Sequence, residues 1–267
     1  MVKGLYTAYT GMVNEQRRMD VMTNNLANSA TTGYKKEAMV AQAFDEKLAI
    51  KIKDTSHWHN MPEKIGYISL GAKIGETYTN WDQGPFQITD KDSDVALGGR
   101  GFFAIEFTNK AGETSIKYTR DGSFVVDNEG YLRTVDGDYV LNADGALGSQ
   151  YGEGFRVQID HSLKYTIGSD GTIRQNREEV DTIGVIDIDN YDYINKYGEN
   201  LYDLIPGGNI IESNAVVEQG TLEASNVNVV DEMVSMIQIA RAYEAGQKMI
   251  QTEDSTLEKT ANTIGRV

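Results

Sequence analysis

The position of proline divides this chain of 267 residues into three parts. Only three prolines are present, Pro62, Pro85 and Pro206. Residues 1–61 and 207–267 therefore lack the residue that most disrupts a helix interior, whereas glycine is frequent between positions 66 and 208. This distribution predicts a helical segment at each end and a different, glycine-rich structure between them.

The first segment carries residues at the spacing of a coiled-coil seam. Steps of four and three residues alternate over three heptads, which is typical of a helix packed against another helix. The seam positions are Leu5, Tyr9, Met12, Gln16, Met19, Thr23 and Leu26. The helix is expected to end near Asn28, because Thr31-Thr32-Gly33 signals a chain reversal.

The last segment keeps the same spacing over ten positions. They are Met233, Met236, Ala240, Tyr243, Gln247, Ile250, Asp254, Leu257, Ala261 and Ile264. A second stripe, Val230, Val234 and Ile237, widens the apolar face at its start. Asn228 is the expected N-cap, and Asp231 and Glu232 in the first turn favour the positive end of the helix.

The two end segments are interpreted as one split coiled coil. A single amphipathic helix ordinarily covers the core of its own domain. Terminal segments fray unless they are tied down, so both ends need a partner, either each other or neighbouring subunits. Polar residues within the seams, Gln16, Gln247 and Asp254, are expected to set the register of the pairing.

The middle of the chain is predicted to be β-rich. Turn signals at Asp121-Gly122, Glu129-Gly130, Asp136-Gly137 and Asp144-Gly145 recur every seven or eight residues, a spacing typical of an antiparallel meander. The strand-like runs between and around them are residues 95–97, 102–107, 116–119, 123–126, 131–135, 157–159 and 183–188.

The predicted fold class is α+β, with N- and C-terminal helices pairing as a coiled coil and a central antiparallel β-rich domain. Four regions are expected. They are an N-terminal helix over residues 1–35, an extended linker over 36–80, an outer β-rich domain over 81–212, and a connector with the C-terminal helix over 213–267.

Charge is concentrated in the middle of the chain. The formal net charge is -15, to which residues 1–60 contribute about +2 and residues 213–267 about -4. A strongly acidic chain is a poor partner for nucleic acid. The nearly neutral ends are expected to pack densely, while the acidic middle stays solvated.

The sequence supplies little for catalysis or metal binding. The chain has no cysteine, which excludes disulfides, thiolate metal sites and cysteine nucleophiles. His57 and His59 with Glu63 resemble a zinc ligand set, but such histidines more often lie exposed in a polar loop. Asp90, Asp92 and Asp94 resemble the start of a calcium loop whose required glycine is missing. We therefore expect no metal, cofactor, small-molecule substrate or enzymatic activity.

The Gly98-Gly99-Arg100-Gly101 stretch has a glycine spacing like that of a phosphate-binding loop. It leads into an apolar strand-like run rather than a helix, so a tight turn is the better interpretation. The N-terminus also lacks the apolar run of a cleaved leader, and no stretch approaches 18 consecutive apolar residues. We expect neither a cleaved signal peptide nor a transmembrane helix.

Four stretches of the chain have distinctive sequences: residues 24–35, 94–103, 118–124 and 222–230. The first and last resemble the terminal signatures of the bacterial flagellar rod and hook protein family, and the middle two resemble its β domain. The matching signature residues are Asn24, Asn25, Leu26, Ala27, Asn28, Thr32, Gly33, Tyr34, Leu222, Glu223, Ser225 and Asn226.

This resemblance implies an axial protein of the flagellar basal body, which spans the cell envelope. In the family, the terminal helices pair in an inner domain, these domains stack into a helical tube, and the β domain lies outside. It implies a homopolymer that contacts other flagellar rod and hook proteins and is exported by the flagellar type III apparatus. The length suits a rod protein better than a hook protein.

Two other classes of function compete with this interpretation. A secreted β-rich module that binds cell-wall glycan would use its helical ends for oligomerisation and aromatics such as Trp58, Trp81 and Tyr151 as a sugar platform. Aromatics scattered through a β domain more often belong to its core or rim. A wall-processing enzyme would need paired carboxylates, and none stands out.

Overall fold

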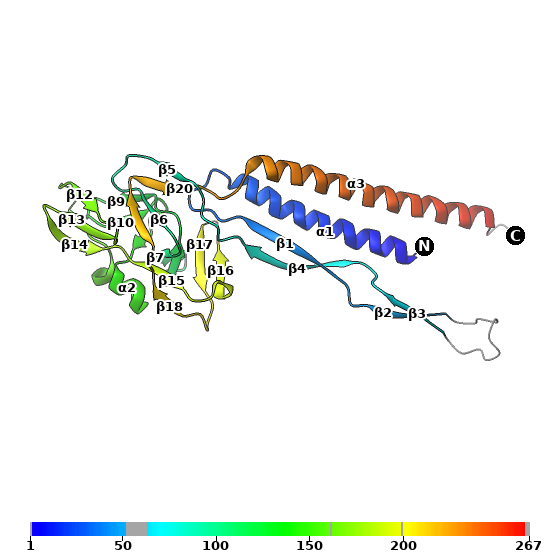
Figure 1. Cartoon of the computed structure of the whole chain (residues 1–267). Helices are drawn as coiled ribbons and strands as arrows, with labels where there is room; N and C mark the ends of the chain where they lie inside the picture. Colours follow the sequence, from blue (N-terminus) through cyan, green and yellow to red (C-terminus); the bar gives the residue numbers. More distant parts are fainter. Residues whose placement is uncertain (1, 52–62, 161, 199, 265–267) are drawn as a thin grey trace. The chain divides into compact units, whose positions relative to one another are not determined.

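The computed structural model of the chain describes residues 2–51, 63–160, 162–198 and 200–264, and both ends of the chain are long helices (Figure 1). They are α1 (Val2–Ala27) and α3 (Val229–Lys259), and α3 continues into a π-helical turn, η3 (Thr260–Ile264). The Asn228 side chain accepts a hydrogen bond from the Val230 N–H at 3.1 Å and so caps α3. The predicted helix end near Asn28 and the predicted N-cap are both confirmed.

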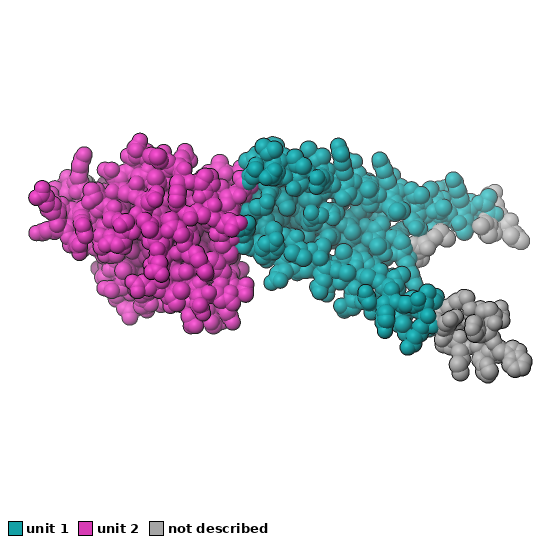
Figure 2. All heavy atoms as spheres, in the orientation of Figure 1, with its two compact units in different colours: residues 1–27, 36–80, 228–267 teal, residues 28–35, 81–227 magenta. Residues whose placement is uncertain are grey.

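The chain divides into two compact units (Figure 2). Unit 1 comprises residues 1–27, 36–80 and 228–267, and unit 2 comprises residues 28–35 and 81–227.

Unit 1 combines the two helices with two antiparallel strand pairs. The described parts of residues 36–80, expected to be an extended linker, form paired strands. β1 (Glu37–Ala43) pairs with β4 (Ala72–Thr79), and β2 (Lys47–Lys51) pairs with β3 (Glu63–Ile68). Each pair contains one register shift.

Unit 2 is built on a nine-stranded antiparallel sheet. Seven strands follow the order β16-β17-β8-β7-β11-β10-β9, and β15 joins β7 to β18. The strands are β7 (Phe102–Thr108), β8 (Thr114–Thr119), β9 (Phe124–Val126), β10 (Leu132–Thr134), β11 (Tyr139–Val140), β15 (Val185–Ile188), β16 (Ile194–Tyr197), β17 (Leu201–Leu204) and β18 (Ile210–Glu212).

Smaller elements complete unit 2. A three-stranded sheet contains β12 (Tyr165–Ile167), β13 (Thr172–Gln175) and β14 (Glu178–Thr182). Two further pairs join β5 (Phe86–Ile88) to β20 (Thr221–Glu223), and β6 (Val95–Gly98) to β19 (Val216–Gln219). The short helices are α2 (Ala143–Gly148), η1 (Glu153–Phe155) and η2 (Tyr191–Tyr193).

The core of unit 2 lies on both faces of β7. Phe103 and Ile105 belong to one buried apolar cluster, while Phe102 and Ala104 belong to a second. Alternate residues of a strand point to opposite faces, so β7 is covered on both sides. This explains why residues 102–105 of the strand are continuously apolar rather than alternating.

The predicted α+β class, with terminal helices and a central antiparallel β-rich region, is confirmed. Several local predictions were wrong. The Asp144-Gly145 turn signal lies inside α2, because Asn142 caps that helix by accepting from the Gly145 N–H at 2.9 Å. Residues 157–159 form only an isolated bridge at Gln158. Residues 213–227, expected in the connector, supply β19 and β20 of unit 2.

None of the helices in the described part of the chain is both long and apolar enough to cross a membrane.

Candidate assembly site

α1 and α3 form an antiparallel pair within unit 1 (Figure 1). The start of α1 lies against the end of α3, because a Cβ atom on Gly4 would lie 2.7 Å from Glu253 Oε1. Further along, a Cβ atom on Gly246 would lie 2.6 Å from Met12 Cγ. Glycine at position 246 therefore lets the two helices approach closely.

The α3 seam has the predicted spacing, but half of its positions are shifted by one residue. The positions that face inward are Glu232, Met236, Ile239, Tyr243, Gly246, Ile250, Glu253, Leu257 and Thr260. Met236, Tyr243, Ile250 and Leu257 of the predicted seam are among these positions. Met233, Gln247, Asp254 and Ala261 are exposed, and Ala240 is half-buried beside Ile239. The side chain of Ile264 lies outside the described residues.

The cause of the shift is the chemistry of the residues that occupy the seam. Glu232 and Thr260 are not apolar, whereas the residues that follow them, Met233 and Ala261, are. Gly246 and Glu253 are not apolar either, and Gln247 and Asp254 were assigned to the seam only because they continue the 3/4 spacing. Gln247 and Asp254 are exposed on α3, so the register role predicted for them stays a prediction that concerns neighbouring subunits.

On α1, too, some of the predicted seam positions are half-buried and others are exposed. Leu5, Met12, Met19 and Leu26 are half-buried, whereas Tyr9, Gln16 and Thr23 are exposed. Three polar residues on α1 are buried instead, Thr10, Asn14 and Asn25. Gln16 is exposed like Gln247, and the register role predicted for it also stays a prediction.

Asn25, one of the signature residues, joins the end of α1 to the start of β1. Its side-chain amide donates to the Glu37 carbonyl at 2.8 Å, and its Oδ1 accepts from the Glu37 N–H at 3.0 Å. The side chain thus replaces a neighbouring strand for one residue of β1. Beside it in sequence, Lys36 forms an ion pair with the buried Glu232 of α3. Both contacts hold the strands of unit 1 to its helices.

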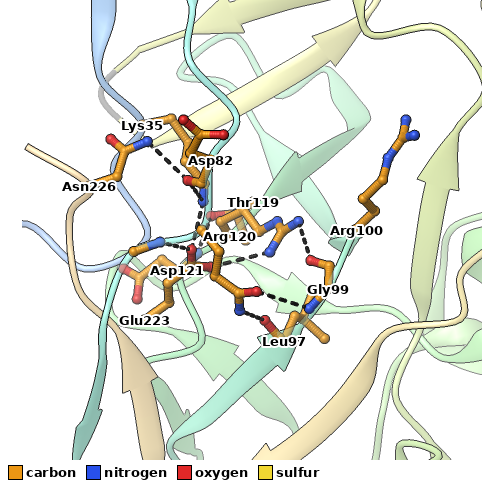
Figure 3. Close-up of polar contacts among 12 residues, drawn as sticks. Lys35, Asp82, Leu97, Gly99, Arg100, Thr119, Arg120, Asp121, Glu223 and Asn226 are labelled. Carbon is orange, nitrogen blue, oxygen red and sulfur yellow. Dashed lines mark hydrogen bonds and ion pairs between the residues drawn. The ribbon is translucent and has the colours of Figure 1, made fainter.

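Another signature residue, Glu223, lies at the centre of a buried charged cluster in unit 2 (Figure 3). We call Lys35, Gly84, Arg120 and Glu223 the signature cluster. Glu223 accepts hydrogen bonds from Lys35 Nζ at 2.6 Å, from Arg120 at 3.2 Å and from the Gly84 N–H at 2.8 Å. The side chains of all three charged residues are at most 4% exposed.

The cluster is tied to the β domain by further hydrogen bonds. Arg120 donates to the Gly99 carbonyl at 2.8 Å, and Lys35 donates to the Asp82 carbonyl at 2.9 Å. The Asp82 carbonyl also accepts from the Asn226 side chain at 3.0 Å. The side chain of Arg100 points away from the cluster (Figure 3). These hydrogen bonds hold residues that are far apart in the sequence close together within unit 2.

Gly33 permits the close approach of its segment to this point. Its φ is 67°, and a Cβ atom there would lie 2.5 Å from the backbone carbonyl carbon of Arg120. The Gly33 N–H donates to the Glu223 carbonyl at 2.8 Å. Next to it, the Thr32 hydroxyl donates to Asp121 at 2.7 Å, and Tyr34 is fully buried.

The remaining signature residues have minor or local roles. Leu222 and Ser225 are buried, and the Ser225 hydroxyl accepts from the Val227 N–H at 3.3 Å. Asn28 accepts from the Thr31 hydroxyl at 3.3 Å. Asn24 and Ala27 are exposed on α1.

The electrostatics of the signature cluster are those of a structural site. Burial lowers the pKa of Lys35, and the neighbouring Glu223 carboxylate acts in the opposite direction. One carboxylate faces two cations here, and it accepts hydrogen bonds from both. Such an arrangement holds together segments that are far apart in the sequence.

The candidates for other chemistry do not form sites in the described residues. His57, His59 and Trp58 lie outside them, and the remainder contains no cluster of three or more potential metal ligands. Trp81, considered as part of a sugar platform, packs instead against Phe102, Tyr191 and Tyr202 with ring centroids 4.9–5.4 Å apart. Gly98–Gly101 connects β6 to β7, as the tight-turn interpretation predicts.

Three family models match the chain. "Flagella basal body rod protein" matches residues 5–35, "Flagellar hook protein FlgE/F/G D1 domain" residues 96–175, and "Flagellar basal body rod FlgEFG protein C-terminal" residues 218–264. Among curated proteins, the chain is 34% identical to the flagellar basal-body rod protein FlgF of Caulobacter vibrioides, covering 100% of this chain and 98% of the relative. It is 32% identical to FlgG of Buchnera aphidicola (97% and 98% covered) and 31% identical to FlgG of Bacillus subtilis (98% and 99%).

The chain belongs to the flagellar basal-body rod protein family. Each charged member of the signature cluster falls in a different matched segment: Lys35 in the first, Arg120 in the second and Glu223 in the third. In this rod-family chain, the three matched segments are therefore joined by one buried network of charges.

Sequence reasoning identified Glu223 as a signature residue but missed its partners. Arg120 and Gly84 were not among the candidates, and neither was Gly246 of the helix seam. A buried ion pair between distant residues leaves no periodic pattern in the sequence. The available signal was the presence of a basic residue in a stretch that resembled the rod family, namely Arg120 in residues 118–124.

Proposed function

We propose that this chain is a structural subunit of the flagellar rod that polymerises through α1 and α3 into the axial tube of the basal body. The tube acts as a drive shaft that transmits torque, and axial proteins are exported through it. Other rod and hook proteins are its neighbours, and the subunit reaches its place through the flagellar type III apparatus without cleavage of a signal peptide. The subunit performs no enzymatic reaction.

The observation that carries the proposal is the apolar surface left on the helix pair of unit 1. Val230, Met233, Val234 and Ile237 lie on the first turns of α3 and are 49–67% exposed. An exposed apolar patch on a helix marks a surface that another molecule covers. In a family of rod proteins, neighbouring rod subunits supply that cover.

The acidic β-rich middle is then the part of the subunit that faces outward. The alternative, a secreted module that binds cell-wall glycan, is weakened because Trp81 is packed among aromatic side chains rather than presented to a ligand. Within the family, the run Gln251–Asp254 resembles the distal rod protein, while relatives of both the FlgG and FlgF types match at similar identity. Locating the subunit along isolated basal bodies by electron microscopy decides between them.

Deletion of residues 2–27, or of residues 229–264, tests the role of the helices. Each deletion removes one member of the helix pair, so the truncated chain is expected to be absent from isolated basal bodies and the cells to be non-motile. The expression level of the truncated chain, measured by immunoblot of whole cells, separates failed assembly from degradation. Rods that contain either truncated chain would show that the helices are not the assembly elements.

A further inference from the structure

A groove in unit 1 lies between α1 and the paired strands. Its walls are Tyr9, Thr10, Val13 and Asn14 of α1, together with Phe44, Ala72, Lys73 and Ile74. The cavity has a volume of about 240 Å³ and its lining is mostly apolar. We call it the Asn14 groove. Because it opens to solvent next to the exposed Tyr9 and Ile74, side chains from another molecule can enter it.

One polar atom in this groove has no partner. Asn14 is 6% exposed, and its Oδ1 accepts no hydrogen bond from any of the described residues. A buried acceptor without a donor is destabilising, and native proteins rarely leave one unmatched. The groove therefore fits a binding partner whose surface is apolar but also carries a hydrogen-bond donor.

The outward face of α3 has this composition. Each helical residue advances by 100°, which puts Val230, Val234 and Ile237 about half a turn away from the seam that faces α1. Within its own chain this stripe is 49–67% exposed. Arg241 and Glu244 follow on the same face, one and two turns beyond Ile237. Neither forms an ion pair with any of the described residues, and both are exposed.

We propose that the Asn14 groove of one subunit receives the outward face of α3 from a second copy of this chain. Val234 and Ile237 of the second copy occupy the apolar part of the groove. The guanidinium of Arg241 donates to Asn14 Oδ1. Glu244 lies next to Lys73, an exposed cation that has no ion pair among the described residues.

The choice of a second copy as occupant rests on the proposed function and on this complementarity. An apolar wall meets an apolar stripe. An acceptor, a donor, a cation and an anion that have no partners among the described residues of their own chain are matched with one another. Since the groove and the stripe are different surfaces of the same unit, the contact is head-to-tail. A head-to-tail contact that does not close on itself generates a helical filament.

Cysteine cross-linking tests which surfaces meet, and the natural absence of cysteine makes every engineered thiol unique. Val13→Cys places a thiol in the groove, and Ile237→Cys places one on the stripe. Under assembling conditions, a bis-maleimide is expected to link the two variants into a heterodimer when they are mixed. Val135→Cys, a 71% exposed position in unit 2, replaces Ile237→Cys in the control mixture and is expected to give only background linkage.

Other outcomes contradict the proposal. Strong linkage of Val13→Cys to itself would indicate a symmetric groove-to-groove contact and overturn it. Background linkage in the mixture, while the unmodified chain sediments as a polymer, would overturn the groove contact but leave the proposed rod function intact. If the unmodified chain is also absent from basal bodies and does not polymerise, the proposed function and this inference both fail.

A charge exchange gives an independent test that does not alter the apolar contact. Lys73→Glu and Glu244→Lys each put like charges together, so each is expected to raise the concentration needed for assembly by about fivefold. The double variant restores opposite charges with the signs exchanged and is expected to assemble like the unmodified chain. If the effects of the two substitutions simply add in the double variant, Lys73 and Glu244 do not meet.

Discussion

At the scale of single residues, the most constrained position is Glu223. Its carboxylate is buried with two cations and a backbone N–H, over distances of 2.6–3.2 Å. Removing charged groups from water is costly, and the cost is offset only when each charge is paired and hydrogen-bonded. The cluster therefore stabilises the fold only as a complete set.

Glu223→Gln is expected to destabilise the protein by about 3–5 kcal/mol, because it leaves Lys35 and Arg120 buried without a counter-charge. Urea unfolding followed by circular dichroism measures the change. The matched control is Glu179→Gln, which breaks an ion pair of 2.7 Å with Arg174 whose side chains are 51% and 63% exposed. The control is expected to change stability by less than about 1 kcal/mol. Equal effects of the two substitutions would contradict the role assigned to the cluster.

The signature residues illustrate how far sequence reasoning reached at this scale. Gly33 was predicted at a chain reversal, and its positive φ agrees with that role. Asn25 and Glu223 were recognised only by resemblance, because their partners are a backbone segment and two distant cations. No local rule predicts such contacts. They depend on which segments the whole fold brings together.

At the scale of elements, the helix pair shows why periodicity alone misplaces a seam. The 3/4 spacing was recovered, yet alternate positions of α3 were assigned one residue late. The seam contains glycine and glutamate where helices approach most closely or meet polar groups. Apolar spacing therefore predicts that a helix packs against another element. It does not predict which face of the helix lies at the contact, because that depends on how closely the two helices approach.

Two glycine substitutions distinguish the seam from the rest of the pair. Gly11→Ala is expected to stabilise α1 by about 1 kcal/mol, because a Cβ atom there meets nothing within 4 Å. Gly246→Ala places its Cβ 2.6 Å from Met12 Cγ and is expected to lose that gain through overpacking. Thermal unfolding monitored at 222 nm should separate the two variants by about 1–3 kcal/mol. Equal gains from both would show that Gly246 does not lie against α1.

At the scale of the whole molecule, the sequence established the order of helical end, β-rich middle and helical end, and the structure has that order. It did not reveal that the described parts of residues 36–80 form paired strands, since short strands with polar residues between them have weak periodicity. It also did not reveal that residues 28–35 and 213–227 belong with the β-rich unit. Those boundaries follow from long-range contacts such as Lys35 with Glu223.

Stability of the β-rich unit is expected to fall in acid. The hydrogen bond from Arg156 lowers the pKa of Glu106 from its ordinary value of 4.5, and the two side chains are paired at 2.8 Å. The folded state therefore binds this proton less readily than the unfolded chain, so the contribution is present above pH 4.5 and is lost as the pH falls through the lowered value. Urea midpoints measured between pH 3 and 7 should show a shallower dependence for Glu106→Gln than for the unmodified chain. An unchanged dependence would exclude Glu106 as a contributor.

The position of the signature cluster along the chain has a kinetic consequence. Lys35 and Glu223 are 188 residues apart in sequence, and contacts over such separations form slowly because a long loop must close first. During synthesis, Lys35 is made early, but it cannot pair with the carboxylate of Glu223 until most of the chain has been made. A chain whose stabilising pair is completed this late remains without its final fold for nearly the whole of its synthesis.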